Sequence, residues 1–388
     1  MLWDNYIFER GDDVRRLWID FYGDRSRKFV YITGRGFDLR ANIVLEQFIK
    51  TVKNSKKPPV GSKLLIINYS KYKLDNELEN LVDENHSKLV SLFEGFGEIQ
   101  NLDLLGETPI QGLSTSASIS HGMRKLMPEI EGYSDIVLDI STLPRIVFLT
   151  IATSILGKIV DKNHTNPLGK CDKNFQIIVA EDPSVDSAIA SEEPSNEVAA
   201  IPGFRSIEFE VHADKPLIWF PILGENRANQ LQIVMSQKIR QKATNVEICP
   251  VLPFPTVSPR RGDKLILEYK DTLFRGFDIS PQNILYAHEG SPFECYRQLF
   301  SAMKRYSESF SLIGGCNLVV TPMASKLITL GAALACFDMI PSDTSAEYGV
   351  SIPYVEPKKY VAKNIEKIKN PKPILSNLML TGEAYHLD

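Results

Sequence analysis

Four turns in this chain carry residues that could hold an anion. In the first half, the apolar run 29–33 leads into a glycine turn from Gly34 to Arg40, and a second apolar run leads into a hydroxyl and basic turn from Asp139 to Arg145. Glycines allow a backbone to approach a ligand closely, and the first N–H groups of a helix attract phosphate. A hydroxyl beside a guanidinium suits the same kind of ligand. These residue types therefore predict a site for a phosphorylated or otherwise anionic small molecule.

The second half of the chain repeats this pattern in the same order and at nearly the same spacing. Gly224 to Arg227 follows the apolar run 218–223, and Thr321 to Lys326 follows another apolar run. We therefore expect two related units, each with two ligand-binding turns. The residues expected to contact a ligand are Gly34, Gly36, Asp38, Arg40, Asp139, Ser141, Thr142, Arg145, Gly224, Glu225, Asn226, Arg227, Thr321, Ser325 and Lys326.

The hydroxyl residues of these turns are also candidates for helix caps, because Ser and Thr oxygens accept hydrogen bonds from the first free N–H groups of a helix. We expect Ser141 or Thr142 to cap the helix that starts near Pro144, and Thr321 to cap its counterpart. The segment 181–183, Glu-Asp-Pro, predicts a further helix start, with a catalytic carboxylate as the alternative.

A proline-rich stretch in the second half has no counterpart in the first. Repeated prolines over 250–259 favour an extended backbone that loses little entropy on ordering. We expect this arm, 250–275, to present Arg260, Arg261 and Asp263 to a ligand. The alternative is a surface corner in which Arg261 and Asp263 form an exposed ion pair.

The elements that must position these residues alternate between short buried strands and longer helices. Strands are expected at 28–33, 63–68, 99–104, 135–140 and 175–180, and again at 217–223, 246–251 and 317–321. Helices are expected near 39–53, 74–95 and 144–160, and again at 226–242, 292–308 and 323–337. This alternation predicts an α/β fold of two Rossmann-like, doubly wound, mostly parallel sheet units arranged as a pseudo-dimer.

The length of 388 residues also indicates two domains. We expect an N-terminal unit over 1–190 with a helical lead-in, and a C-terminal unit over 206–388 that includes the arm. The stretch 183–205 is rich in Ser, Glu, Pro and Ala and is the candidate linker.

Composition excludes several classes of partner. The formal net charge of −4 argues against general nucleic-acid binding, since that requires a basic footprint. No apolar stretch approaches the length of about 20 residues that spans a bilayer, and the N-terminus does not resemble a signal peptide. The odd number of widely spaced cysteines, 5, indicates reduced thiols. We therefore expect a cytoplasmic protein without a membrane partner.

The sequence indicates neither a metal nor a nicotinamide cofactor. Leu39 and Arg40 stand where a dinucleotide fingerprint would place its third glycine. The histidines and cysteines show no metal-ligand spacing. Gly-x-Ser-x-Gly and Walker-type motifs do not occur. The cofactor, if there is one, stays unknown at this stage.

At these turns the chain resembles the CRISPR-associated Rossmann-fold (CARF) sensors and their two-lobed relatives, the SAVED domains. The matching positions are Gly34 to Arg40 with Ser141 to Arg145, and Gly224 to Arg227 with Thr321 to Lys326. The resemblance implies a pocket for cyclic oligonucleotides or related nucleotide signals in a prokaryotic defence system. Such sensors usually carry an effector domain, and no such domain is visible here, so the resemblance also implies either a separate effector protein or degradation of the ligand by this protein itself.

Three functions remain open from the sequence. The first is a sensor that binds a nucleotide or another phosphorylated ligand. The second is an enzyme on a nucleotide or nucleoside, a transferase, glycosidase or phosphodiesterase, that uses Asp38, Asp139, Glu225 or Asp263. The third is a scaffold subunit of a multi-protein complex, in which the repeated turns serve only folding.

Overall fold

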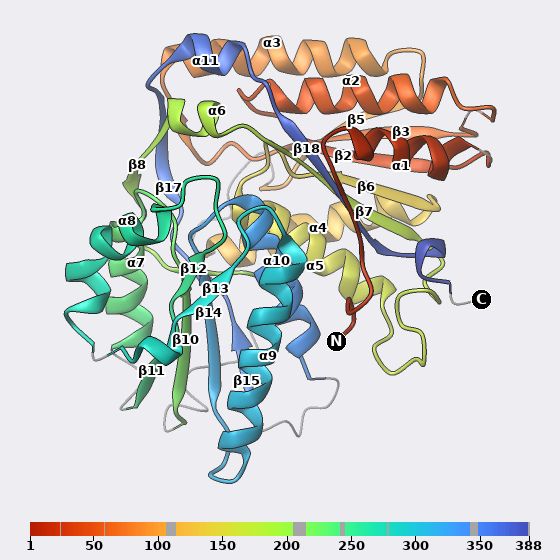
Figure 1. Ribbon diagram of the computed structural model, residues 1–388. Helices are drawn as coiled ribbons and strands as arrows, with labels where there is room; N and C mark the ends of the chain where they lie inside the picture. The colour runs from red at the N-terminus through yellow and green to blue at the C-terminus, as the bar shows by residue number, and fades with distance from the viewer. Residues whose placement is uncertain are drawn as a thin grey trace. The chain divides into compact units, whose positions relative to one another are not determined.

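The chain divides into two compact units in a computed structural model (Figure 1). The structure describes residues 1–23, 25–57, 59–105, 114–204, 215–240, 245–277, 279–341 and 348–386. The N-terminal unit comprises Asn5–Glu193 and Pro357–Asp388, and the inserted unit comprises Met1–Asp4 and Pro194–Glu356. This division differs from the sequence-based boundaries because the C-terminal segment returns to the first unit.

The N-terminal unit is built on a seven-stranded sheet with the order β1-β18-β7-β6-β2-β3-β5. These strands are β1 (Ile7–Arg10), β18 (Ile374–Thr381), β7 (Asn174–Glu181), β6 (Asp135–Asp139), β2 (Phe29–Gly34), β3 (Ser62–Asn68) and β5 (Glu98–Asp103). The five strands from β7 to β5 are parallel, while β18 runs antiparallel to both β7 and β1. The returning C-terminal strand therefore completes this sheet.

Helices cover both faces of this sheet, as the doubly wound prediction requires (Figure 1). They are α1 (Asp12–Gly23), α2 (Arg40–Lys53), α3 (Asn76–Phe93), α4 (Thr115–Glu131), α5 (Arg145–Ile159), α6 (Pro183–Ala188) and α11 (Ile365–Lys369). α1, α2 and α3 bury aromatic and aliphatic side chains against one face, among them Trp18, Tyr22 and Phe48. Asp75 caps α3, as its position predicts, by accepting a hydrogen bond from the Leu78 N–H at 2.9 Å.

The order of the strands reverses at β2. The chain proceeds from β2 to β3 and β5 on one side, and then returns to β6 and β7 on the other. In such a sheet the loops after the two strands at the reversal diverge to opposite faces, and ligands bind in the crevice between them. The loops after β2 and β6 are thus the part of this unit where a site is expected.

A small three-stranded sheet, with the order β4-β17-β8, completes the N-terminal unit. It consists of β4 (Lys73–Leu74), β17 (Pro357–Ala362) and β8 (Ile189–Pro194). β8 and β17 are the two segments through which the chain leaves for and returns from the inserted unit.

The inserted unit has a parallel sheet with the order β13-β12-β10-β14-β15, and β11 also pairs with β10. Its strands are β10 (Leu217–Ile222), β11 (Val246–Ile248), β12 (Val251–Pro253), β13 (Leu285–Ala287), β14 (Asn317–Pro322) and β15 (Gly349–Ser351), with a separate pair β9 (Ala199–Ala200) and β16 (Pro353–Tyr354). Its main helices are α7 (Ala228–Val234), α8 (Arg261–Glu268), α9 (Pro292–Ser311) and α10 (Lys326–Met339), and π-helical turns at 235–239 and 270–274 extend α7 and α8. The strand order again reverses at its first strand, β10.

The predicted extended arm over 250–275 is wrong in its second half. β12 and the irregular residues 254–260 are followed at once by α8. The prolines end at Pro259, so every later residue of the arm can donate the backbone hydrogen bond that a helix needs. Arg261 and Asp263 therefore lie on the first turn of a helix, not on an extended strand.

Two glycines in helices give a matched test of packing in the two units. A Cβ at Gly331 in α10 would lie 2.0 Å from the carbonyl oxygen of Pro292 in α9, whereas a Cβ at Gly157 in α5 would meet nothing within 4 Å. We expect Gly331→Ala to destabilise the protein by about 1–3 kcal/mol through overpacking. Gly157→Ala should stabilise it by about 0.5–1 kcal/mol, because alanine favours helix. Chemical denaturation would measure both, and equal effects of the two substitutions would contradict this account.

Candidate functional site

The two turns at the strand reversal of the N-terminal unit lie against each other, as the sequence predicts. β2 and β6 are neighbours in register Ile32↔Leu138. The Thr142 hydroxyl donates to the Gly34 carbonyl oxygen at 3.2 Å. A Cβ at Gly34 would lie 2.8 Å from Leu143 Cδ2. Glycine at position 34 is thus explained by the close approach of the turn after β6.

Gly36 is less crowded than Gly34. A Cβ there would meet only the Thr142 Cβ, at 3.9 Å. Its carbonyl oxygen accepts a hydrogen bond from Asn85 Nδ2 in α3 at 3.1 Å. The neighbouring Arg35 lies 2.7 Å from Asp83, also in α3. α3 therefore fixes the loop through Asn85 and Asp83, while the space next to the Gly36 Cα is open.

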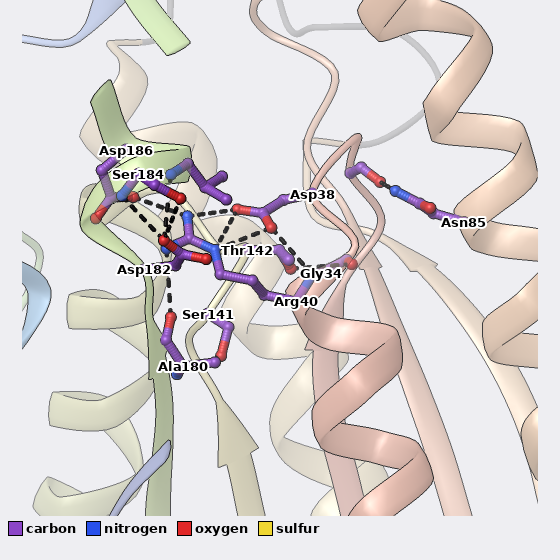
Figure 2. Close-up of polar contacts among 12 residues, drawn as sticks. Gly34, Asp38, Arg40, Asn85, Ser141, Thr142, Ala180, Asp182, Ser184 and Asp186 are labelled. Carbon is purple, nitrogen blue, oxygen red and sulfur yellow. Dashed lines mark hydrogen bonds and ion pairs between the residues drawn. The ribbon is translucent and has the colours of Figure 1, made fainter. Parts of the chain in front are cut away.

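Arg40, predicted to contact a ligand, is committed to carboxylates of the protein (Figure 2). Its Nε donates to both Asp38 oxygens at 3.0 and 2.9 Å, and its Nη2 lies 2.6 Å from Asp38 Oδ2 and 2.9 Å from Asp186 Oδ1. Burial alone would lower the pKa of the Arg40 guanidinium, but the charges of Asp38 and Asp186 raise it above its usual range. The side chain of Arg40 is 6% exposed, so a ligand could reach the guanidinium only by displacing a partner.

Asp139 and Ser141 form buried hydrogen bonds at the carboxyl edge of the sheet. The Asp139 carboxylate accepts hydrogen bonds from the Tyr31 hydroxyl at 3.2 Å and from the Ser141 N–H at 2.9 Å. Ser141 Oγ accepts from the Ala180 N–H of β7 at 2.9 Å. Both residues are fully buried. They position the turn after β6 and are not exposed contacts for a ligand.

The predicted caps of α5 and α10 are wrong. The N-cap of α5 is Pro144, without a side-chain hydrogen bond, since Ser141 and Thr142 direct their oxygens to other strands and loops. The N-cap of α10 is Ser325, which accepts from the Ile328 N–H at 3.4 Å. Thr321 instead accepts a hydrogen bond from Trp219 Nε1 at 2.9 Å. Arg145 remains at the edge as the first residue of α5 and is half-buried.

The inserted unit also brings its two turns together. β10 and β14 are neighbours, and a Cβ at Gly224 would lie 2.2 Å from the Met323 carbonyl oxygen. The Tyr269 hydroxyl, at the end of α8, donates to the Gly224 carbonyl oxygen at 2.7 Å. Asn226 adopts a left-handed conformation with φ of 59°, which asparagine tolerates better than most residues. Arg227 and Lys326 lie at the starts of α7 and α10.

The basic residues predicted on the arm separate in the structure. Arg261 forms ion pairs with Glu225, in the turn after β10, and with Glu289. Burial would raise the pKa of Glu225, but its hydrogen bonds to Arg261 hold that pKa below its usual value. Arg260 and Asp263 are exposed, so the alternative ion pair between Arg261 and Asp263 is replaced by pairs with two glutamates.

Sequence reasoning missed three residues that organise these edges, namely Asn85, Asp186 and Glu289. Asp186 and Glu289 each follow a strand end by a few residues, a placement that could have marked them as residues of the carboxyl edge. Asn85 lies in the middle of α3, and nothing local distinguishes it from a surface amide.

The segment after β7 begins with an acid that acts as a helix cap. Asp182 Oδ1 accepts from the Ser184 and Val185 N–H groups at 2.9 and 3.4 Å, and Oδ2 accepts from the Lys372 N–H at 2.6 Å. This confirms the predicted helix start at 181–183. Burial would raise the pKa of Asp182, but a hydrogen bond from the Ser184 hydroxyl, at 2.7 Å, together with these backbone hydrogen bonds holds it below its ordinary value.

In the described part of the chain, no group of three or more His, Cys, Asp or Glu side chains has a geometry that could hold a metal ion. None of the helices in the described ranges combines the length and apolar character that a bilayer span requires.

The low pKa of Asp182 gives a pH-dependent prediction. Its contribution to stability is present above the ordinary aspartate pKa of about 4 and is lost as the pH falls through the lower pKa of the folded state. We expect Asp182→Asn to reduce the free energy of unfolding by about 1–2 kcal/mol at pH 7. Urea denaturation should show this difference shrinking below about pH 4. A difference that stays constant from pH 7 to pH 2.5, or an equal loss in the exposed control Asp172→Asn, would contradict the role of the charged cap.

Comparisons with known proteins give no family for this chain. No family model matches it, and no curated protein matches it. Among solved structures, a UDP-GlcNAc 2-epimerase from Neisseria meningitidis bound to UDP-GlcNAc is 14% identical with a TM-score of 0.21, over 82% of this chain and 89% of that chain. An α,α-trehalose-phosphate synthase from Burkholderia xenovorans in complex with glucose-6-phosphate is 11% identical with a TM-score of 0.23, over 78% of this chain and 70% of that chain. At these TM-scores the likenesses carry no argument about fold or ligand.

Proposed function

We propose that the N-terminal unit binds a nucleotide or another phosphorylated small molecule where the loops after β2 and β6 meet. The observation that carries this proposal is the position of the glycine loop. Gly34 and Gly36 lie at the reversal of strand order, directly against the turn that leads into α5. α5 has no side-chain cap and begins with Arg145. A helix start with a guanidinium beside a glycine loop suits a phosphate group.

The hydrogen bonds and ion pairs of the candidate catalytic carboxylates favour a ligand-binding protein over an enzyme. A general base needs an oxygen within hydrogen-bond reach of the proton it removes. Asp38 is paired with Arg40, Asp139 is fully buried with Tyr31 and Ser141, and Glu225 is paired with Arg261. Three of the four candidates for a catalytic base therefore already hold structural partners, and the fourth, Asp263, is exposed on α8. Conversion of the ligand is the alternative function that the test below can detect.

The strand orders of the two units support the proposal of an internal duplication, while the pseudo-dimer arrangement stays a prediction. Both sheets have the strand order 3-2-1-4-5 when their five principal parallel strands are numbered along the chain. In both, the glycine after the first strand packs on the turn after the fourth, and the helix after the second strand holds the glycine loop.

The residue directly after the first glycine has the opposite charge in the two loops, however, Arg35 in one and Glu225 in the other. In the N-terminal unit Arg35 of the loop pairs with an acid of α3, whereas in the inserted unit Glu225 of the loop pairs with Arg261 of α8. An acid directly beside the glycine disfavours a phosphate at that point. We therefore place the primary anion site in the N-terminal unit.

We infer that the biological role of this binding is that of a sensor. The CARF and SAVED resemblance implies a nucleotide signal as ligand, with either a separate protein as effector or degradation of the ligand by this protein. The third possibility, a scaffold subunit, would leave the glycine loop without a ligand.

Substitutions at the proposed site provide the test. We expect Arg145→Ala to weaken binding by roughly 10- to 100-fold, because a lost charged hydrogen bond costs about 1.5–3 kcal/mol. Gly36→Val should weaken it as well, since the added side chain would fill the open space at the loop without a backbone clash. Isothermal titration calorimetry with a panel of mononucleotides, dinucleotides and cyclic oligonucleotides would measure the affinities.

The matched control is Lys326→Ala, which removes a charge from the equivalent helix start of the inserted unit. Unchanged affinity in both Arg145→Ala and Gly36→Val, or an equal loss in the control, would overturn the assignment of the site. Chromatography of the ligand after prolonged incubation would show whether it is converted, which would establish the enzyme alternative.

A further inference from the structure

The guanidinium of Arg40 holds two carboxylates in unequal ways. Asp38 accepts hydrogen bonds from Nε and Nη2 with both of its oxygens and is 9% exposed. Asp186 makes one contact, 2.9 Å from Nη2, and its side chain is 59% exposed. A buried, two-pronged pair is much stronger than a single contact that solvent can reach. Asp38 is thus the permanent partner of Arg40, and Asp186 is the exchangeable one.

Asp186 approaches Arg40 from a short element that is separate from the glycine loop. α6 spans six residues after β7, and Figure 2 shows its acidic side chain, Asp186, on the side of Arg40 opposite to Asp38. Asp186 therefore covers the edge of the guanidinium that Asp38 leaves unoccupied. Arg40 begins α2, directly after the glycine loop proposed to bind phosphate.

We propose that the Asp186 carboxylate occupies a phosphate subsite on Arg40 when no ligand is bound, and that a phosphate group of the ligand displaces it. This inference rests on the proposed function of the glycine loop. A guanidinium N–H donates to a phosphate oxygen as it does to a carboxylate oxygen, so the exchange at Nη2 preserves the type of hydrogen bond. Asp38 stays bound throughout and keeps Arg40 in place. The subsite selects ligands that carry a phosphate beyond the one at the start of α5.

The exchange would also remove the ion pair that joins α6 to the start of α2. α6 is tied to the returning C-terminal segment, because the Ala188 carbonyl oxygen accepts from the Lys363 N–H at 2.8 Å and Asp182 accepts from the Lys372 N–H. α6 continues directly into β8, which ends where the chain passes into the inserted unit at Pro194. Binding of a phosphate at Arg40 therefore removes one of the contacts that hold α6, and α6 leads into the segment that connects the two units. A change in such a connection is what a ligand signal needs in order to leave this unit.

The test is Asp186→Asn, which removes the competing charge and keeps the shape of the side chain. With inorganic pyrophosphate and a nucleoside diphosphate as probes, we expect the variant to bind at least about 5-fold more tightly than the unmodified protein, because a competitor for Arg40 is gone. Hydrogen exchange over 183–194 should be faster in the variant without ligand and in the unmodified protein with ligand. Asp186→Ala should act in the same direction.

Glu46→Gln is the matched control, since it removes one acid from an exposed ion pair with Lys50 on α2. It should leave affinity and exchange unchanged. If the unmodified protein binds the probes but Asp186→Asn binds them no more tightly, the exchange at Arg40 is overturned and the proposed function stands. If neither protein binds any probe, both fall. Tighter binding in Glu46→Gln as well would attribute the effect to net charge and would also overturn the exchange.

Discussion

The buried pair of Arg40 and Asp38 is the interaction around which the carboxyl edge of the N-terminal unit is arranged. A buried charge is costly unless it is paired and its hydrogen bonds are satisfied. Asp38 also accepts the backbone N–H of Arg40 at 3.0 Å, so it fixes both the start of α2 and the end of the glycine loop. The same guanidinium reaches the Ala180 carbonyl oxygen at the end of β7 at 3.4 Å. One side chain thus links the loop after β2 to β7, two strands away in the sheet.

The second constraint on the fold is the return of the C-terminal strand. β18 inserts between β1 and β7, and its position is secured by polar contacts that only a completed sheet can provide. Trp18 Nε1 donates to Asn377 Oδ1 at 3.0 Å, and the Phe175 N–H donates to the Thr381 hydroxyl at 3.2 Å. These groups are buried, so leaving them without partners would cost about 1–3 kcal/mol each. The N-terminal unit is therefore complete only when the chain has passed through the inserted unit and come back.

These long-range contacts explain which predictions the sequence could support. Apolar runs identify the strands 29–34 and 135–139 because burial on both faces of a parallel sheet requires continuous hydrophobic residues. The cap at Asp75 is predictable because its partner lies three residues along the chain. The caps assigned to Ser141 and Thr321 failed because their actual partners, Ala180 and Trp219, come from other strands of the sheet. The return of the C-terminal strand depends likewise on pairing that leaves no local signal.

The two units have similar turns in sequence but differ in the side chains placed at those turns. Both glycine loops are held by the helix after the second strand, so the repeated pattern reports a requirement of the fold as well as of a ligand. The two loops differ in the charged side chain that follows the first glycine, Arg35 in one and Glu225 in the other. Arg35 is paired with the exposed Asp83, whereas Glu225 and Glu289 together surround Arg261. Beside the glycine, a phosphate would meet Arg35 in one unit and the carboxylates of Glu225 and Glu289 in the other. The repeat therefore predicts two similar scaffolds, and the side chains placed on them favour an anion in only one.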